Sequence, residues 1–370
     1  MAGTSMRERF GQKLSISTNK PDNGHHSKIE WCDNFNRRYE VLDEVMPSGH
    51  KHAKVCFGRR KLDDTEVVIK LRFKPYCFRR VADERDWRRN TELLMNFPPH
   101  ESICKLFEVL EDERAIYIIM ERIHGMDLFE TLEAEGYLEA DVACDVLRQL
   151  LEATAFLHSH SAVHKDLKLE NVMLDKRSSI NGTKMPKPVR KVKVIDFDTV
   201  EEWSPLSPAS KDVVGTDQYI AQEAYAGRYS PASDMFALGV IAYRTLTGRF
   251  PFDEKTFDDA PGENWVGSAK MNEIRQKLNT IRVDYSHRAF VNNPKALDII
   301  QKLLSSDETV RPSAREALNH PWFRGDDQLL EIAITNSRSE AVCGDSVDAG
   351  ALVASEAVMS LAHRRTLFRI

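Results

Sequence analysis

The sequence predicts an α+β fold in two lobes, a small β-rich lobe followed by a large helical lobe. Runs of β-branched and aromatic residues recur early in the chain, at 39–42, 55–57, 66–70 and 115–120. One helical stretch, roughly 79–95, interrupts them. After Gly125 apolar residues recur at spacings that form one helical face: Val142, Val146, Leu147, Leu150, Leu151 and Leu157. We expect the functional site in the cleft between the lobes.

Composition indicates an ordinary globular protein. The chain has 370 residues and a formal net charge of −5, and its charged residues are of mixed sign. No apolar run is long enough to span a bilayer, and the polar amino terminus lacks a secretory signal. The six cysteines are scattered without a C-x-x-C pair, which is typical of free thiols in a reducing compartment. We therefore expect a cytoplasmic protein, with the nucleus as the alternative.

The most informative stretch is residues 163–171, Val-His-Lys-Asp-Leu-Lys-Leu-Glu-Asn, followed after an insertion by residues 194–198, Val-Ile-Asp-Phe-Asp. It resembles the catalytic loop and metal-binding motif of eukaryotic protein kinases of the serine/threonine type. The resemblance covers about 36–323, and residues 311–314 and 320–323 look like the end of a calmodulin-dependent or calcium-dependent kinase catalytic domain. We expect a flexible arm over 1–36, a kinase domain over 37–323 (lobes 37–121 and 122–323) and a tail over 324–370.

The resemblance implies a role for each polar residue of these motifs. Asp166 is expected to accept or orient the proton of the substrate hydroxyl, and Lys168 to lie beside the transferred phosphoryl group. Asn171 and Asp196 would supply oxygen ligands, which suit a hard cation such as Mg²⁺. Asp166 alone could be a solvated loop aspartate, but with Asn171 and Asp196 in register the catalytic interpretation is favoured.

Lys70 ends the predicted strand at 66–70 and matches the lysine that holds the α and β phosphates of ATP. Its expected partner is a glutamate on the following helix. We choose Glu92, although the spacing from His100 fits it only with a shift of one residue, and Glu84 is the rival.

The resemblance also outlines a nucleotide pocket. Met120 falls at the gatekeeper position, and the hinge that follows, including Glu121 and Ile123, would hydrogen-bond adenine through its backbone. Asp127 matches the acidic residue near the ribose. Asp127 and Glu170 are also the positions at which basic-directed kinases bind an arginine upstream of the phosphorylated residue, although both could be solvated acids.

The glycine-rich loop that covers the phosphates in this family is degraded. Aligned on Val55, the segment reads Ser-Gly-His-Lys-His-Ala-Lys-Val over 48–55, and Gly49 takes a glycine position of the motif only if the register slips by one residue. Glycines there let backbone N–H groups approach phosphate closely, and His50 and Ala53 place Cβ atoms in that space.

A second motif, Gly-Thr-Asp-Gln-Tyr-Ile-Ala-Gln-Glu over 215–223, resembles the segment that receives the substrate peptide. The resemblance implies that Thr216 hydrogen-bonds the catalytic loop near Asp166, that Glu223 forms a buried ion pair with Arg311, and that Asp234 braces the catalytic-loop backbone. Kinases of small molecules lack this peptide platform, so the motif favours protein substrates.

Two further departures leave an alternative open. Asp198 replaces the last glycine of D-F-G and adds a carboxylate near the phosphates, and Lys165 replaces the usual arginine of H-R-D. Lysine cannot offer a bidentate fork to an activation-loop phosphate, so control by Ser204, Ser207 or Ser210 phosphorylation is in doubt. With the degraded loop, these changes raise the alternative of a pseudokinase scaffold.

Two other segments suggest partners. Residues 351–370 could form a basic amphipathic helix that binds calmodulin or blocks the cleft, but packing against the large lobe is favoured. The basic and aromatic residues between Arg72 and Arg89 could contact nucleic acid, yet a solvated helix face is the simpler interpretation. We expect ATP, Mg²⁺ and protein substrates as partners, and neither nucleic acid nor a membrane span.

Overall fold

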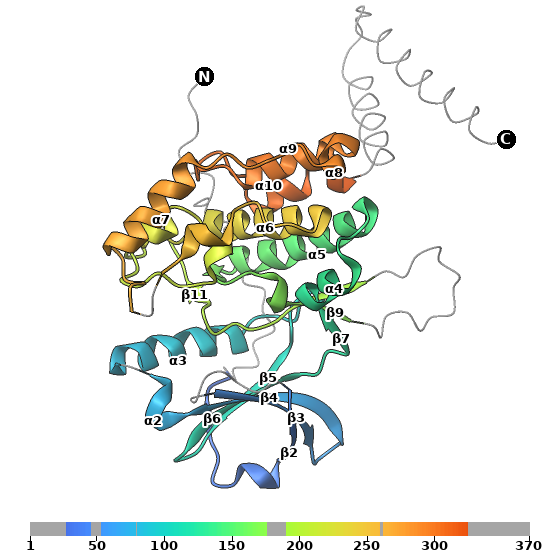
Figure 1. Ribbon diagram of the computed structural model, residues 1–370. Helices are drawn as coiled ribbons and strands as arrows, with labels where there is room; N and C mark the ends of the chain where they lie inside the picture. The colour runs from blue at the N-terminus through green and yellow to red at the C-terminus, as the bar shows by residue number, and fades with distance from the viewer. Residues whose placement is uncertain (1–26, 46–52, 79, 176–189, 260–261, 325–370) are drawn as a thin grey trace, which may run out of the picture. The chain divides into compact units, whose positions relative to one another are not determined.

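The computed structural model describes residues 27–45, 53–78, 80–175, 190–259 and 262–324. The chain divides into two units, 1–323 and 324–370, and all but the first residue of the second unit lie outside the described ranges. Within the first unit a β-sheet lobe precedes a helical lobe (Figure 1), which confirms the predicted fold class. The predicted helix at 351–370 and Gly49 lie outside the described residues.

The small lobe is built on a six-stranded sheet of order β1-β5-β6-β4-β3-β2. Neighbouring strands are antiparallel, except that β1 pairs with β5 in parallel. The bounds are β1 Glu30–Trp31, β2 Tyr39–Glu44, β3 Ala53–Arg60, β4 Thr65–Phe73, β5 Leu106–Glu111 and β6 Ala115–Glu121. All four predicted strands are therefore present, each extended by one or more residues.

The first strand corrects the predicted amino-terminal boundary. We expected the arm to run to residue 36, but β1 pairs with β5 and Phe35 is buried. The Phe35 ring stacks on Tyr117 with centroids 3.9 Å apart, and a short 3-10 helix, Phe35–Arg37, leads into β2. Polar composition concealed this segment, because Cys32 and Phe35 are the only buried residues among 30–36.

The other face of the sheet packs against helix α3, Val81–Met95, which follows the single turn α2, Lys74–Cys77. Trp87 of α3 packs on Val109, Ile116 and Ile118. The predicted helix at 79–95 is therefore confirmed. It begins after Arg80, whose backbone N–H donates to the Asp83 carboxylate at 3.1 Å in a capping arrangement.

The large lobe packs around α5 and α6. The predicted apolar face at 142–157 is confirmed, because Val146, Leu147, Leu150, Leu151 and Leu157 are buried. Almost every residue of α6 is buried. The helices are α4 Leu128–Glu135, α5 Ala140–Ser159, α6 Pro231–Thr247, α7 Ala269–Thr280, α8 Arg288–Asn292, α9 Pro294–Leu303 and α10 Ala314–Leu318. The shorter 3-10 turns are η2 Leu169–Asn171, η4 Asp217–Tyr219, η5 Ala224–Ala226 and η6 Glu254–Phe257.

Two small sheets hold the loops that carry the motifs. One has the order β10-β9-β7, and the other pairs β11 with β8. The catalytic-loop motif lies between β8 and β9, and Val-Ile-Asp-Phe-Asp begins at the last residue of β10. The bounds are β7 Gly125–Asp127, β8 Ala162–Val163, β9 Val172–Asp175, β10 Lys191–Val194 and β11 Glu201–Glu202.

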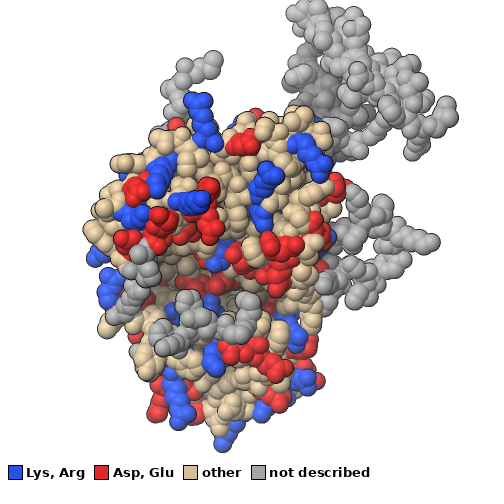
Figure 2. Space-filling model, in the orientation of Figure 1, with Lys and Arg blue, Asp and Glu red and all other residues tan. Residues whose placement is uncertain are grey.

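The surface in view mixes both signs of charge, with lysines and arginines interspersed among acidic residues (Figure 2). In the described part of the chain, no helix combines the length and apolarity that crossing a membrane would require.

Candidate active site

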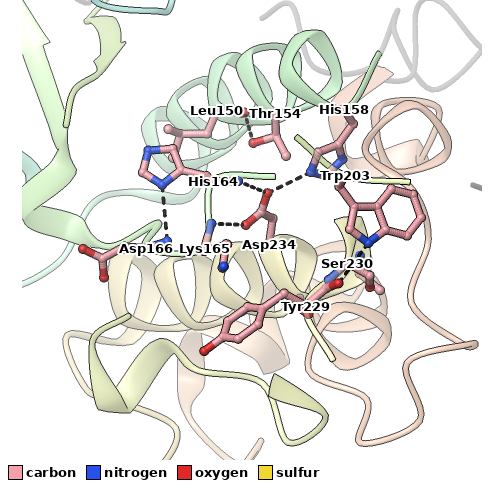
Figure 3. Close-up of polar contacts among 12 residues, drawn as sticks. Leu150, Thr154, His158, His164, Lys165, Asp166, Trp203, Tyr229, Ser230 and Asp234 are labelled. Atoms are coloured by element: carbon pink, nitrogen blue, oxygen red, sulfur yellow. Dashed lines mark hydrogen bonds and ion pairs between the residues drawn. The ribbon is translucent and has the colours of Figure 1, made fainter. Parts of the chain in front are cut away.

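Asp234 fixes the backbone of the catalytic loop. Its carboxylate is almost fully buried and accepts hydrogen bonds from the backbone N–H groups of His164 and Lys165, each at 2.9 Å (Figure 3). His158 Nε2 lies 2.9 Å from the same carboxylate. Burial opposes the charge, but the hydrogen bond and attraction to His158 hold the pKa of Asp234 below its ordinary value. The predicted bracing contact is confirmed.

Both motif loops contain a residue in the left-handed region. Lys165 has φ = 70° and Asp196 has φ = 58°, although neither is glycine. Such conformations are uncommon for residues with a Cβ and persist where surrounding contacts impose them. Here the contacts of Asp234 fix the first loop, so the backbone is held in the geometry that directs Asp166.

Asp166, Lys168 and Thr216 form a triangle of polar contacts. The Thr216 hydroxyl donates to Asp166 Oδ1 at 2.9 Å, which confirms the predicted hydrogen bond. Lys168 Nζ donates to Thr216 Oγ1 at 3.0 Å and lies 3.3 Å from Asp166 Oδ2. A carboxylate and an ammonium are thus placed side by side, with the threonine fixing both.

Asn171 and Asp196 each leave an oxygen available for a cation. Asn171 Nδ2 donates to the backbone carbonyl of Asp166 at 2.8 Å, so the amide oxygen is the atom left over. Asp196 uses Oδ1 for Lys70 and for the Asp198 N–H. Neither Asn171 Oδ1 nor Asp196 Oδ2 hydrogen-bonds to a described residue. Mg²⁺ takes one or two protein oxygens together with phosphate and water, so this donor set fits it.

The predicted pairing of Lys70 with Glu92 is wrong. Lys70 Nζ lies 2.8 Å from both Asp196 Oδ1 and Asp198 Oδ2. Glu92 instead accepts a hydrogen bond from the Ile29 N–H at 3.5 Å. The rival, Glu84, pairs with Arg88 at 2.8 Å. Glu92 lies next to Thr91, which with Trp87 forms the buried part of α3.

The remaining predicted nucleotide residues lie around the junction of the lobes. Val55 of β3 pairs directly with Lys70 of β4. Glu121 uses its N–H in the sheet, donating to the Lys105 carbonyl at 2.9 Å. No described residue hydrogen-bonds the backbone of Ile123. Met120 is half-buried beside the Trp87 cluster.

Asp127 also has a structural role, because it caps α4 by accepting from the Glu130 N–H at 2.7 Å. Burial, together with repulsion from Glu130 and Glu170, raises the pKa of Asp127. Glu170 Oε2 is buried and has no hydrogen-bond partner among the described residues. Glu170 thus adds to the negative charge near Asp127, and one of its own oxygens has no donor in the described part of the chain.

The predicted ion pair beneath the platform is confirmed. The Arg311 guanidinium is fully buried and contacts both carboxylate oxygens of Glu223, at 2.6 and 2.9 Å. It also donates to the carbonyls of Ser305 and Ala232, at 2.8 and 2.9 Å. Ser233 donates to Glu223 at 2.9 Å, so both charges are paired and hydrogen-bonded.

One contact of the catalytic loop was missed from the sequence. The Lys165 side chain is 8% exposed, its Nζ lies 2.5 Å from the Glu201 carboxylate, and it sits over the Tyr229 ring at 4.5 Å. The next residue, Glu202, pairs with Arg89 of α3 at 2.5 Å. The sequence signal that could have revealed this contact was the pair of adjacent acids, Glu201 and Glu202, shortly after Val-Ile-Asp-Phe-Asp.

Comparison with known proteins agrees with these contacts. Residues 48–323 match the protein kinase domain family. Calcium-dependent protein kinase 4 of Plasmodium berghei (strain Anka) is 30% identical over 82% of this chain and 54% of its own length. CDPK-related kinase 4 of Arabidopsis thaliana is 31% identical over 81% of this chain and 47% of its own length. The chain thus spans about half the length of these relatives.

The matched range covers most of the chain. It contains the catalytic loop, the metal-binding motif at 194–198 and the buried Glu223–Arg311 ion pair. The chain is therefore a member of the protein kinase family, with a catalytic domain similar to those of calcium-dependent and CDPK-related kinases.

Proposed function

We propose that the protein transfers the γ-phosphoryl group of ATP to serine and threonine hydroxyls of protein substrates. The observation that carries this proposal is the contact between Asp166, Lys168 and Thr216. It joins the catalytic loop to the segment that would receive a peptide. A hydroxyl bound there would meet a carboxylate to orient it and an ammonium to balance the developing charge.

Each residue has a definite task in such a transfer. Asp166 orients the attacking hydroxyl and accepts its proton, while Lys168 stabilises charge on the transferred group. Lys70 neutralises the phosphates that stay with the nucleotide, and Asn171 and Asp196 would hold the cation. When bound, Mg²⁺ would neutralise negative charge on the phosphates. Little covalent chemistry is asked of the protein, so positioning accounts for most of the rate.

Two alternatives make different predictions. A pseudokinase scaffold would lack phosphoryl transfer, yet the residues expected to contact hydroxyl and metal are all retained, and Asn171 hydrogen-bonds to Asp166. A small-molecule kinase would not phosphorylate polypeptides, whereas the segment 215–223 is anchored by the buried Glu223–Arg311 pair.

Incubation of a protein mixture with γ-labelled ATP, followed by phosphoamino acid analysis, tests the proposal. We expect label on serine and threonine, and label on tyrosine or on metabolites alone would contradict it.

The acidic pair suggests a preference for basic substrates. Asp127 and Glu170 repel one another, and a substrate arginine would relieve that repulsion and give Glu170 Oε2 a donor. The double variant Asp127→Asn/Glu170→Gln keeps both shapes, and asparagine still caps α4. We expect kcat/KM for an arginine-containing peptide to fall about tenfold, because a charge-assisted hydrogen bond is lost. The same peptide with alanine for arginine is the control, and an equal loss on both peptides would contradict the preference.

The Lys165–Glu201 pair predicts activity without activation-loop phosphorylation. An activation-loop phosphate usually supplies negative charge opposite the catalytic-loop cation, and here Glu201 already supplies it. We expect phosphatase treatment, verified by intact mass, to leave kcat within about twofold of its starting value. Glu201→Gln should lower kcat in the same assay. A phosphatase-treated enzyme that loses its activity would show that a phosphate is needed after all.

A further inference from the structure

Lys70 is held by two acids of residues 194–198, a segment that we call the metal loop, and by no acid of helix α3. The helix carries four acids, and each has another partner: Asp83 binds Arg80, Glu84 binds Arg88, Asp86 lies beside Arg85, and Glu92 accepts from Ile29. The buried face of the helix presents Trp87 and Thr91, which are uncharged. The Lys70 side chain is only 14% exposed, so its ammonium needs a nearby anion.

Asp198 supplies that anion from the opposite lobe. Its Oδ2 lies 2.8 Å from Lys70 Nζ and 3.0 Å from Arg72 Nη1, so one carboxylate oxygen meets two cations. Lys70 and Arg72 are two residues apart on β4, and side chains at that spacing share a face of the sheet. Glycine, the family residue at 198, has no side chain to place between them.

The Arg72 side chain makes further contacts that restrain it, and these also restrain its ion pair with Asp198. Its guanidinium lies over the rings of Phe78 and Trp87, at 5.0 and 4.9 Å from their centroids. It also donates to the Cys77 carbonyl at 3.3 Å. Through Arg72, Asp198 is linked to Trp87 of α3, so the metal loop and the helix are joined by a cation.

From this arrangement we infer that Asp198 is a positioning residue: it is the carboxylate partner of Lys70, in place of a glutamate on α3. The inference rests on the proposed phosphoryl transfer, because it assigns the role to the lysine that would bind the nucleotide phosphates. Asp196 also contacts Lys70, but its proposed task is to bind the cation. Asp198, which has no proposed cation to bind, then holds the ammonium together with Asp196 Oδ1.

The pairing can be tested without catalysis, on the nucleotide-free full-length protein. A soluble amine-acylating reagent is applied at fixed pH, and the modification rate of Lys70 is followed by peptide mapping. We expect Asp198→Asn and Asp198→Gly to speed acylation of Lys70 by at least about threefold, the size of a modest ion-pair energy. Glu92→Gln is the matched control and should leave the Lys70 rate at its wild-type value. Two Asp198 variants are used so that one can replace the other if it fails to fold.

Faster acylation in Glu92→Gln, or an unchanged rate in both Asp198 variants, would overturn the inference. A second readout addresses catalysis. Asp198→Gly restores the family residue, yet we expect kcat/KM for ATP to fall about tenfold while KM for the peptide stays the same. A rate equal to or above wild type would count against the positioning role. If the wild-type protein transfers no phosphate, the proposed function fails, and the acylation rates still decide whether Asp198 holds Lys70.

Discussion

Replacing Asp166 with asparagine is expected to lower kcat by about 10²- to 10⁴-fold, the usual contribution of a positioned general base. Asparagine can still accept the hydrogen bond from Thr216, so the local geometry should persist. It cannot accept the proton of the substrate hydroxyl, nor balance the charge of Lys168 at 3.3 Å. Steady-state transfer of labelled phosphate to a peptide measures the change.

The matched control is Asp64→Asn, the same chemical change at an exposed position in the turn between β3 and β4. Asp64 has φ = 59°, a conformation that asparagine tolerates. We expect this variant to keep the wild-type kcat, and both variants to keep the wild-type Tm. An Asp166→Asn enzyme as active as the control would contradict the assigned role.

Replacing Arg311 with methionine is expected to lower the free energy of unfolding by about 3–5 kcal/mol. The substitution leaves the Glu223 carboxylate buried without its cation, and it removes the donors to the Ser305 and Ala232 carbonyls. The cost arises mainly from the unpaired charge. Urea unfolding followed by circular dichroism measures it.

The double variant Arg311→Met/Glu223→Met separates lost charge pairing from lost packing. With both charges gone, no buried ion lacks a partner, so the loss should be smaller than the sum of the two single losses. A strictly additive double variant, or a single variant that costs less than about 1 kcal/mol, would show that the pair contributes little.

Most of the fold was predictable because the hydrophobic periodicity of the sequence identifies its main strands and helices. The strands at 66–70 and 115–120 and the helical face at 142–157 are long or regular enough to identify, and each is present. The amino-terminal boundary was not predictable. Residues 30–36 are mainly polar, and β1 is defined by backbone pairing with β5, which side-chain patterns do not reveal.

The site was predictable where a motif fixes several residues at once. The contacts of Thr216, Glu223 and Asp234 follow from such motifs and are confirmed, while the chemical roles of Asp166, Asn171 and Asp196 stay predictions. The partners of Lys70 were not predictable, because they come from the loop after β10 and not from α3. Which side chains surround Asp198 depends on how β4 lies against the metal loop, and a sequence alone does not contain that distance.

The central claim, that this chain is an active protein kinase, is tested most directly by one assay. Purified wild-type protein is incubated with γ-labelled ATP and a mixture of serine- and threonine-containing peptides, with and without Mg²⁺. We predict that label reaches the peptides only when the metal is present. No transfer to any polypeptide in the presence of Mg²⁺ would contradict the account.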